Sequence, residues 1–360
     1  MARTPLQPLA IDELAPGPRV SVAIASYNYA RYLPECLDSC LAQTVKVDEI
    51  VIVDDGSSDA SWAVIQSYMD RFAHIRGSRQ SNAGICATTN AALAGCTGDV
   101  VLLLDSDDAM LPIRVERVLG ALRERIDGHL PGWVHHSVQR FSGTHENLGN
   151  TPHYGTDALC QGFLVDHVLD TGQTVVSTVS SGLSFRREVI AAVGPLDEHR
   201  VMNQDLQFWI AASLMSPVAW IAEPLSRYRM HGKSVNSGGT MSTLAKVRTA
   251  LEQEDRLGVW IRALLERSRP DALARWKPAS ERLSYQWLRF LERWWSGSGK
   301  DFSLLFRILR DPETRAASTQ QRMYVYSSVF LPQRPFLAFS RFIFGSSPAK
   351  TMLRRLLGRA

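Results

Sequence analysis

Short apolar runs alternate with helix-like patterns over residues 20–104 of the chain. Between the runs, apolar residues recur at the spacing of a helix that packs on a sheet. The predicted strands cover 20–25, 49–53 and 99–104, and the predicted helices cover 33–41, 62–68 and 85–94. Strands joined by helices of this length predict right-handed crossovers and a parallel sheet. We therefore expect an α/β fold with a Rossmann-like, mostly parallel sheet flanked by helices.

Polar residues gather directly after these strands, at 26–28, 54–55 and 105–107. In open α/β sheets, ligands bind at the carboxyl ends of the strands. The Gly-x-Gly-x-x-Gly motif and the Gly-x-x-x-x-Gly-Lys-Ser/Thr loop are both missing after the first strand. Phosphate groups would therefore have to be held by other residues.

Asp105 and Asp107 are the sharpest chemical signal. Two carboxylates at the end of a buried strand cost desolvation energy unless a cation or hydrogen-bond donors compensate them. Alternate residues of an extended segment point the same way, so the two side chains are expected to converge. Mg²⁺ or Mn²⁺, bound by one or two carboxylates and by substrate phosphates, is a natural compensation. The alternative is an acidic turn whose aspartates cap a helix.

Tyr27, Asp54 and Asp55 lie at the same predicted edge. A carboxylate there can accept hydrogen bonds from a nucleobase or a ribose hydroxyl, and Tyr27 could offer an aromatic face to a base. The alternatives are an Asp-Gly-Ser turn that caps the next helix, and a tyrosine of the core or of a hinge.

Composition narrows the class of protein. Of the 360 residues, 45% are apolar and 21% are charged, which argues against wholesale disorder and against a short disulfide scaffold. No apolar run approaches the roughly 18 residues that cross a bilayer, and residues 1–19 lack the pattern of a signal peptide. The five cysteines are expected to be buried free thiols in a reducing cytosol.

Charge is unevenly placed along the chain. The net charge is +4, yet residues 314–360 hold eight Lys or Arg and no Asp or Glu, and the other residues hold 32 basic and 36 acidic groups. Aromatic and aliphatic residues accompany the basic ones over 330–360. One hypothesis is peripheral docking of this tail on an anionic membrane. The alternative is a C-terminal helix that packs back on the protein. Nucleic acid is not expected as a partner, because no recognition motif accompanies the charge.

Seven blocks in order resemble the family 2 glycosyltransferases, which have the GT-A fold. The first four are VSVAIASYNYARYLPECLDSCLAQT, DEIVIVDDGSSD, SNAGICATTNAAL and GDVVLLLDSDD. SSGLSFRREVIAAVGPLDE resembles the segment before the family's catalytic base, NQDLQFWIAAS the block with the base, and YRMHGKSVNS the terminal Tyr-Arg-x-His-x-x-Ser block. The resemblance covers roughly residues 19–237. It implies inverting, metal-dependent transfer of a sugar from a nucleoside diphosphate donor, with UDP expected, to a saccharide or lipid-linked acceptor hydroxyl. By analogy, the setting is bacterial surface polysaccharide or glycolipid assembly on the cytoplasmic side of the cell membrane.

The resemblance also implies roles for individual residues. Tyr27 and Asp55 would hold the base and Asp54 the nucleoside region, while Asn82 and Gly84 would lie near the ribose and phosphates.

Asp105 would bind the ribose, or the metal through water, and Asp107 and His231 would ligate Mn²⁺ or Mg²⁺. Asp205 would be the catalytic base, although the family often has Glu-Asp where this chain has Gln204 before it. The alternatives are a helix cap for Asp205 and an ordinary surface histidine for His231. Arg229 and Lys233 would add positive charge for a diphosphate.

The expected domains are an arm at 1–18, the GT-A domain at 19–240 and a helical region at 241–360. Residues 131–180 are expected to form loops and short strands. Their histidines, His135, His136, His145 and His153, match no zinc spacing and indicate a solvated acceptor-side loop.

Two rival functions remain open. A nucleotidyltransferase would need a glycine-rich basic loop after the first strand, and residues 25–28 do not supply one. A non-catalytic sugar-nucleotide-binding partner would not need Asp107, Asp205 and His231 together.

Overall fold

The computed structural model describes residues 5–142, 147–151, 161–172, 179–199, 204–231 and 243–310, together with 326–327, 330–331 and 334–336. The chain divides into two compact units, Met1–Gly232 with Val259–Trp276, and Lys233–Gly258 with Lys277–Ala360. Helix α8 (Leu244–Ser268) contributes residues to both. The predicted division at residue 240 stays a prediction.

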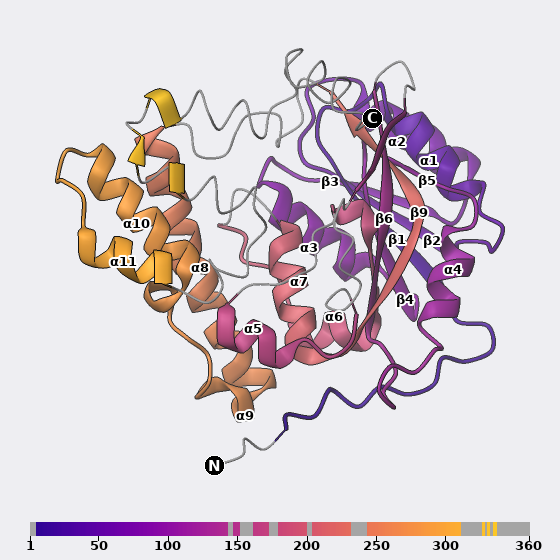
Figure 1. The fold of residues 1–360 in the computed structure, drawn as a ribbon. Helices are drawn as coiled ribbons and strands as arrows, with labels where there is room; N and C mark the ends of the chain where they lie inside the picture. The colour runs from indigo at the N-terminus through magenta and orange to yellow at the C-terminus, as the bar shows by residue number, and fades with distance from the viewer. Residues whose placement is uncertain are drawn as a thin grey trace, which may run out of the picture. The chain divides into compact units, whose positions relative to one another are not determined.

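A nine-stranded sheet organises the first unit, in the order β3-β2-β1-β4-β8-β6-β9-β5, with β7 paired to β6 (Figure 1). Its parallel part consists of β1 (Val20–Ser26), β2 (Glu49–Asp54), β3 (Ile75–Arg79) and β4 (Val100–Asp105). Helices α1 (Leu33–Leu41), α2 (Ser61–Arg71) and α3 (Ile85–Gly95) connect these strands. The predicted α/β fold class is confirmed.

The sheet is mixed beyond β4. It contains β5 (Ala109–Met110), β6 (Trp133–Ser142), β7 (Asn147–Thr151), β8 (Leu183–Arg186) and β9 (Val218–Met230). Strand β6 pairs in parallel with β9, whereas β4 with β8, β6 with β8, β6 with β7 and β5 with β9 are antiparallel. The helices of this part are α4 (Arg114–Ala121), α5 (Val165–Thr171), α6 (Arg187–Val193), α7 (Gln204–Met215) and α9 (Pro270–Leu273), with a 3₁₀ turn at Ser180–Gly182.

The solvated loop predicted for His135 and His136 is wrong. Both lie in β6, a ten-residue strand, and are 1% and 0% exposed. Strands β8 and β9 flank β6 there, which makes it an interior strand, and the His135 ring lies 4.5 Å from the Trp220 ring. The side chains of an interior strand are covered by groups on the two faces of the sheet, which periodicity along one segment does not reveal. His145 and His153 lie outside the described residues.

One face of the sheet carries the main apolar core. Even-numbered residues of β1, β2 and β4 pack there with α1, α2 and α4. Strand β3, which was not predicted, buries only Ile75 among its five residues. It lies at the sheet edge, where a polar sequence such as IRGSR is tolerated. Cys36, Cys40, Cys86 and Cys96 are buried free thiols, and Cys160 is outside the described residues.

Glu49 joins β1, β2, β3 and the loop before β4. Its Oε1 accepts hydrogen bonds from the Ser21 hydroxyl (2.5 Å), the Thr97 hydroxyl (2.9 Å) and the Gly98 amide (3.1 Å), and Arg76 forms an ion pair with Oε2. Burial alone would raise the pKa of Glu49, but these hydrogen bonds outweigh it and lower the pKa to about 2. The folded chain therefore favours the ionised carboxylate.

We expect Glu49→Gln to lower the free energy of unfolding by about 2–3 kcal/mol at pH 7. The folded pKa lies below that of an unfolded glutamate, about 4.3, so the stabilisation is complete above that value and is lost as the pH falls toward 2. Urea titrations of both proteins at pH 7 and pH 3 measure the effect, and the difference should narrow at pH 3. Glu116→Gln, whose side chain is 50% exposed on α4, is the control. If Glu49→Gln lowers the free energy of unfolding by the same amount at pH 7 and at pH 3, the lowered pKa of Glu49 is not the cause of the stabilisation.

The second unit is helical in the part that the structure describes. Residues of α8, α10 (Leu283–Trp295) and α11 (Phe302–Arg310) form its core, together with a 3₁₀ turn at Ala279–Glu281. The core includes Val247, Leu251, Phe290, Leu291 and Ile308. No helix among the described residues is long and apolar enough to cross a membrane.

Candidate active site

The predicted site residues that follow β1, β2 and β4 lie at one edge of the sheet, because parallel neighbours in register end together. Ser26 pairs with Asp54, and Ala25 pairs with Asp105. Tyr27 follows β1 and is 47% exposed. The structure therefore brings the predicted donor-binding segments of these three strands side by side.

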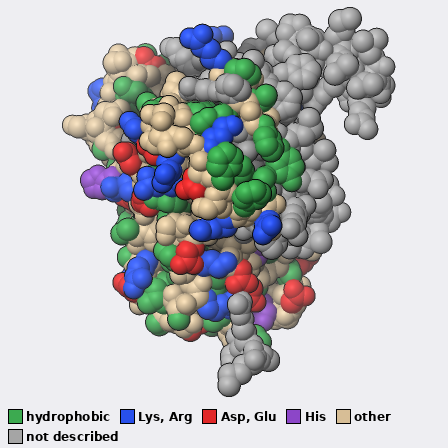
Figure 2. Space-filling view, turned by 60° about the vertical axis from the view of Figure 1, so that its left-hand side comes forward, with side chains coloured by type: hydrophobic (Ala, Val, Ile, Leu, Met, Phe, Trp, Pro, Cys, Tyr) green, Lys and Arg blue, Asp and Glu red, His purple; other side chains and the backbone are tan. Residues whose placement is uncertain are grey.

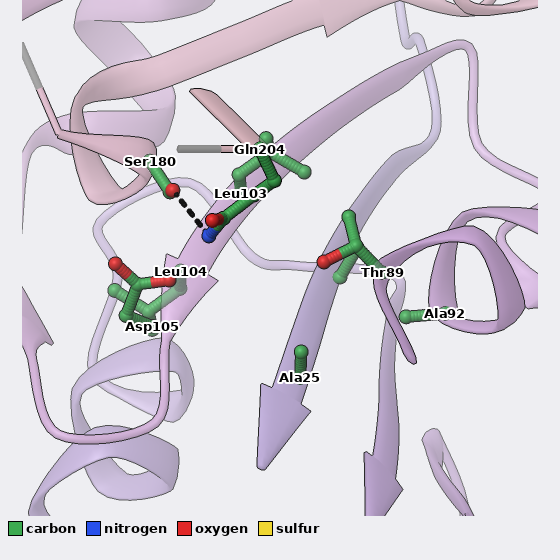
Figure 3. Close-up of a pocket in the computed structure, with 9 residues that line it drawn as sticks. Ala25, Thr89, Ala92, Leu103, Leu104, Asp105, Ser180 and Gln204 are labelled. Carbon is green, nitrogen blue, oxygen red and sulfur yellow. Dashed lines mark hydrogen bonds between the residues drawn. The ribbon is translucent and has the colours of Figure 1, made fainter. Parts of the chain in front are cut away.

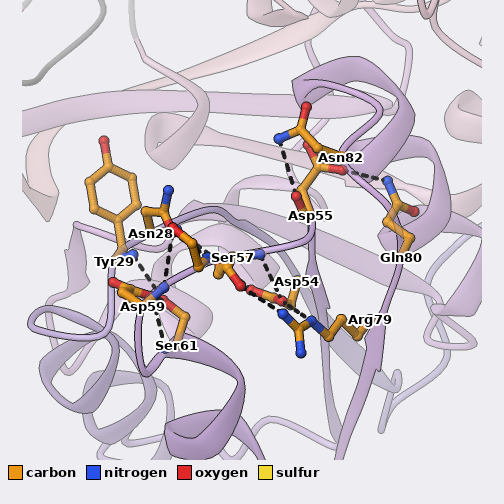
Figure 4. A network of polar contacts seen from close by, with 11 residues as sticks. Asn28, Tyr29, Asp54, Asp55, Ser57, Asp59, Ser61, Arg79, Gln80 and Asn82 are labelled. Carbon is orange, nitrogen blue, oxygen red and sulfur yellow. Dashed lines mark hydrogen bonds and ion pairs between the residues drawn. The ribbon is translucent and has the colours of Figure 1, made fainter.

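Asp54 is fully buried and has internal partners for both oxygens. The Ser57 hydroxyl donates to Oδ1, while the Ser57 amide (3.2 Å) and the Arg79 guanidinium (3.1 Å) meet Oδ2 (Figure 4). This carboxylate holds the turn after β2 against β3. Its contact with a nucleoside stays a prediction.

Asp55 organises the start of α3. Its Oδ1 accepts from the Ala83 amide (2.9 Å) and the Gln80 side chain (2.8 Å), and its Oδ2 accepts from the Gly84 amide (2.9 Å). Asn82 donates to the Asp55 carbonyl oxygen (3.2 Å) (Figure 4). Gly84 has φ +91°, a conformation that favours glycine, and the space beside its Cα is open. The loop predicted to lie near ribose and phosphates is thus held by the carboxylate predicted to bind the base.

The 105–108 segment is a tight turn and not the extended segment that we expected. Asp105 ends β4, and the Asp108 amide donates to the Asp105 carbonyl oxygen (3.0 Å). The carboxylates still converge, because a turn also brings side chains together. Asp108, which was not predicted, is 1% exposed and joins the buried Asp107 and the half-buried Asp105 as a third carboxylate of the turn.

The electrostatics of this turn show how crowded the carboxylates are. Burial, followed by the charges of Asp107 and Asp205, raises the pKa of Asp105 to about 8. Burial and the charges of Asp107 and Asp105 also raise the pKa of Asp108. Arg114, which is fully buried, supplies a counter-charge and donates to the carbonyl oxygens of Leu103 (2.9 Å) and Leu183. A bound cation would favour the ionised carboxylates further.

Asp205 approaches this turn from α7. It is the second residue of that helix and half-buried, and its charge contributes to the raised pKa of Asp105. The Leu206 amide donates to its Oδ1 (2.9 Å), a contact between adjacent residues, and α7 begins at Gln204. Asp205 therefore lies in the first turn of α7 and is not the N-cap residue of the alternative interpretation. Its role as a base stays a prediction.

A small pocket opens beside Asp105. The Gln204 side chain donates to the Ser180 hydroxyl (3.0 Å) at its rim (Figure 3). Strands β1 and β4 and helix α3 supply most of the lining, which comprises Ala23, Ala25, Thr89, Ala92, Leu103, Leu104, Asp105, Ser180 and Gln204. Ser181 accepts from the Asp105 amide (3.0 Å) and donates to Asp108 Oδ2 (2.6 Å), which connects this rim to the turn.

His231 lies directly against Asp107, although 123 residues separate them in the sequence. Its Nε2 is 2.8 Å from Asp107 Oδ2. The ring stacks on Tyr32 at 5.4 Å and meets the edge of Tyr29 at 5.7 Å. Burial, then the charges of Asp107 and Asp105, raise the pKa of the Tyr29 hydroxyl. The structure therefore unites the two predicted metal ligands.

The sequence comparisons identify the family to which this site belongs. A family model described as glycosyl transferase family 2 matches residues 21–191. An uncharacterized glycosyltransferase of Nostoc sp. (strain PCC 7120), alr2836, is 32% identical over 228 residues, which cover 62% of this chain and 69% of that protein. The chain belongs to glycosyl transferase family 2.

This glycosyltransferase is also similar to a further curated protein and to a solved structure. A chondroitin synthase of Escherichia coli is 31% identical over 150 residues, 42% of this chain but only 22% of the synthase. A crystal structure of S. aureus TarS 1-349 matches with a TM-score of 0.50 at 14% identity, and covers 94% of this chain and 91% of that one. At this identity the second similarity shows the fold alone, and it confirms the predicted GT-A fold.

We expected Arg229 to add positive charge for a diphosphate. In the structure its side chain is instead buried and makes internal contacts. It is 3% exposed and lies between the rings of Tyr32 (4.6 Å) and Phe141 (4.3 Å). Its Nε donates to the Asp107 carbonyl oxygen (2.8 Å), and its terminal nitrogen pairs with Glu35. Lys233 lies outside the described residues. Arg229 thus positions Asp107, and it lies two residues before His231, which follows the end of β9.

Several members of the site were not predicted from the sequence. Tyr29 and Tyr32 follow Tyr27 in the segment YNYARY, and Asp108 completes DSDD, so their position was a usable signal. No motif marked Glu35, Arg114 or Ser181. Glu35 of α1 pairs with Arg229, Arg114 begins α4 shortly after the turn, and Ser181 contacts the turn from the 3₁₀ turn at Ser180–Gly182.

We expect Arg229→Lys to lower kcat/KM by roughly 10- to 100-fold and to cost about 1–3 kcal/mol of stability, because lysine lacks the planar fork that reaches Glu35 and Asp107 at once. Transfer rates and thermal unfolding measure both effects. Arg227→Lys is the matched control, since Arg227 also pairs with Glu35 (3.2 Å) and stacks on Phe141 (4.2 Å). Equal losses in the two variants would argue against a specific link to Asp107.

Proposed function

We propose that this glycosyltransferase transfers a sugar, of the hexose type, from a nucleoside diphosphate donor to an acceptor hydroxyl with inversion at the anomeric carbon. The main support is that three parts of the chain lie close together. They are the 105–108 turn, His231 and Asp205. This arrangement offers a place for a diphosphate beside a carboxylate that can accept a proton.

Asp205 would act as the general base. Its carboxylate takes the proton from the acceptor hydroxyl as that oxygen attacks C1 of the donor sugar. A bond forms between the acceptor oxygen and C1, and the bond from C1 to the diphosphate oxygen breaks. The nucleoside diphosphate leaves with the bonding electrons, and the proton ends on Asp205. One displacement of this kind inverts the anomeric centre without a covalent sugar intermediate.

Asp107 and His231 would hold Mn²⁺ or Mg²⁺. No group of three or more His, Cys, Asp or Glu side chains in the described part of the chain is arranged to hold a metal by itself. One carboxylate and one imidazole nevertheless fit such an ion when substrate phosphates complete its coordination, and the raised pKa of Asp105 indicates a turn that would gain from a cation. When bound, the metal neutralises the negative charge that develops on the leaving diphosphate.

The donor would lie along the carboxyl edge, with UDP expected as its nucleotide. Tyr27 and Asp55 would contact the base, Asn82 and Gly84 the ribose and phosphates, and Asp105 the ribose or a metal-bound water. The open space beside Gly84 and the exposure of Tyr27 support this placement.

The setting that we propose is assembly of a polysaccharide or glycolipid on the cytoplasmic face of the cell membrane. Similarity to part of a chondroitin synthase supports a saccharide acceptor. The tail at 330–360, predicted to touch an anionic membrane, lies almost entirely outside the described residues.

The decisive experiment is a screen of nucleotide sugars with Mn²⁺, Mg²⁺ or EDTA, which records release of the nucleoside diphosphate and binding of each donor. Metal-dependent release with one preferred donor is expected. Formation of a nucleotide sugar and pyrophosphate from a nucleoside triphosphate and a sugar phosphate would favour the nucleotidyltransferase. Tight binding of a donor without any turnover, across a panel of saccharide acceptors, would favour a non-catalytic partner.

A further inference from the structure

Helix α11 exposes two large aromatic side chains. Phe302 is 62% exposed and Phe306 is 57% exposed, whereas Leu305 and Ile308 of the same helix are buried in the core of the second unit. A spacing of four residues puts Phe302 and Phe306 on one face. Leu305 and Ile308 already pack α11 against the core of the second unit. The exposed rings therefore indicate a surface that binds an apolar partner.

Basic side chains border these rings. Arg307 and Arg310 are exposed, and the Arg310 guanidinium lies 6.0 Å from the centroid of Phe306. Figure 2 shows hydrophobic side chains beside Lys and Arg side chains on one face of the molecule. Residues 302–310 include no Asp or Glu. Asp301, just before the helix, accepts hydrogen bonds from Ser303 and Leu304, so its charge is used in capping.

We propose that Phe302, Phe306, Arg307 and Arg310 form a surface, the α11 face, that docks on a membrane containing anionic lipid. Rings of this kind insert at the boundary between head groups and acyl chains, and arginines beside them are attracted to anionic head groups. After Asp311 and Glu313, residues 314–360 hold eight further basic and no acidic residues, which adds to the same attraction. A second copy of this chain fits less well, because a symmetric contact would bring arginines against arginines. This inference rests on the membrane setting proposed above and adds a docking surface to it, while its vesicle test does not depend on the proposed transfer reaction.

Sedimentation with vesicles tests the α11 face in the full-length protein. Binding to vesicles of phosphatidylcholine with added phosphatidylglycerol is expected to exceed binding to phosphatidylcholine alone, and to weaken as salt screens the charges. The double variant Phe302→Ser with Phe306→Ser should bind at least about tenfold less. Arg307→Gln with Arg310→Gln should lose about fivefold for each arginine on anionic vesicles and show a smaller preference for anionic over neutral vesicles.

Val259→Ser is the control, because Val259 is an apolar residue of α8 that is 71% exposed. It should bind vesicles as the unmodified protein does. Thermal unfolding checks that each variant folds, and the arginine variants, which leave the apolar core untouched, keep the test valid if the phenylalanine variant is unstable. Undiminished binding by both folded double variants would place docking in the tail and overturn the proposal. So would failure of the unmodified protein to bind anionic vesicles, including a result in which the rings instead mediate self-association.

Discussion

Asp205→Asn is expected to lower kcat by about 10²- to 10⁴-fold while leaving donor affinity nearly unchanged. Asparagine cannot take the proton of the acceptor hydroxyl. It retains the oxygen that accepts from the Leu206 amide (2.9 Å), so the start of α7 should keep its structure. The variant therefore separates the proposed chemical role from the structural role of Asp205 in the first turn of α7.

Initial transfer rates and calorimetric titration with the donor measure the two quantities. Glu198→Gln is a suitable control, because Glu198 is exposed near α7 and accepts a hydrogen bond from Asn90 (3.1 Å). Transfer by Asp205→Asn at the rate of the unmodified enzyme would show that another group is the base.

Asp107→Asn should lower the transfer rate by at least about 100-fold and weaken the dependence on added metal. The substitution keeps the size of the side chain but removes the charge that would hold a divalent ion beside His231. It also relieves one of the repulsive charges that raise the pKa of Asp105 and Asp108, so the fold should not be destabilised by the loss of charge itself.

The measurement is the transfer rate as a function of Mn²⁺ concentration, with EDTA as the zero point. The control is Asp70→Asn, which removes an exposed carboxylate from α2. If Asp107→Asn shows the same rate and the same half-saturating Mn²⁺ concentration as the unmodified enzyme, the metal assignment fails.

Much of the fold follows from local patterns. The predicted strands at 20–25, 49–53 and 99–104 match β1, β2 and β4 within one residue at each end. Runs of β-branched and aliphatic residues predict such strands because they are buried on both faces, and the intervening helices carry an apolar stripe at a fixed period. Strand β3 was not predicted, since IRGSR is polar. Strand β6 is a ten-residue strand in a region where loops and short strands were expected, because its histidines resemble a surface segment.

The candidate site also has a part that the sequence predicted and a part that it did not. The polar clusters after each strand were visible in the sequence, because parallel strands that end together must present their next residues at one edge. The partners of those clusters were not visible. Arg79 pairs with Asp54, Ser181 bridges Asp105 and Asp108, and Arg229 holds Asp107 through its carbonyl oxygen.

The order of motifs along the chain was thus enough to predict the α/β fold and the family, and to name Asp107, Asp205 and His231 as candidates. Tertiary structure alone decided that Asp107 and His231 touch, that Arg229 is buried between Tyr32 and Phe141, and that Asp54 is enclosed. The physical reason is that periodicity records how a segment meets its own neighbours, whereas these contacts depend on strand register and on side chains from β9, α1 and β3 that arrive from far along the chain.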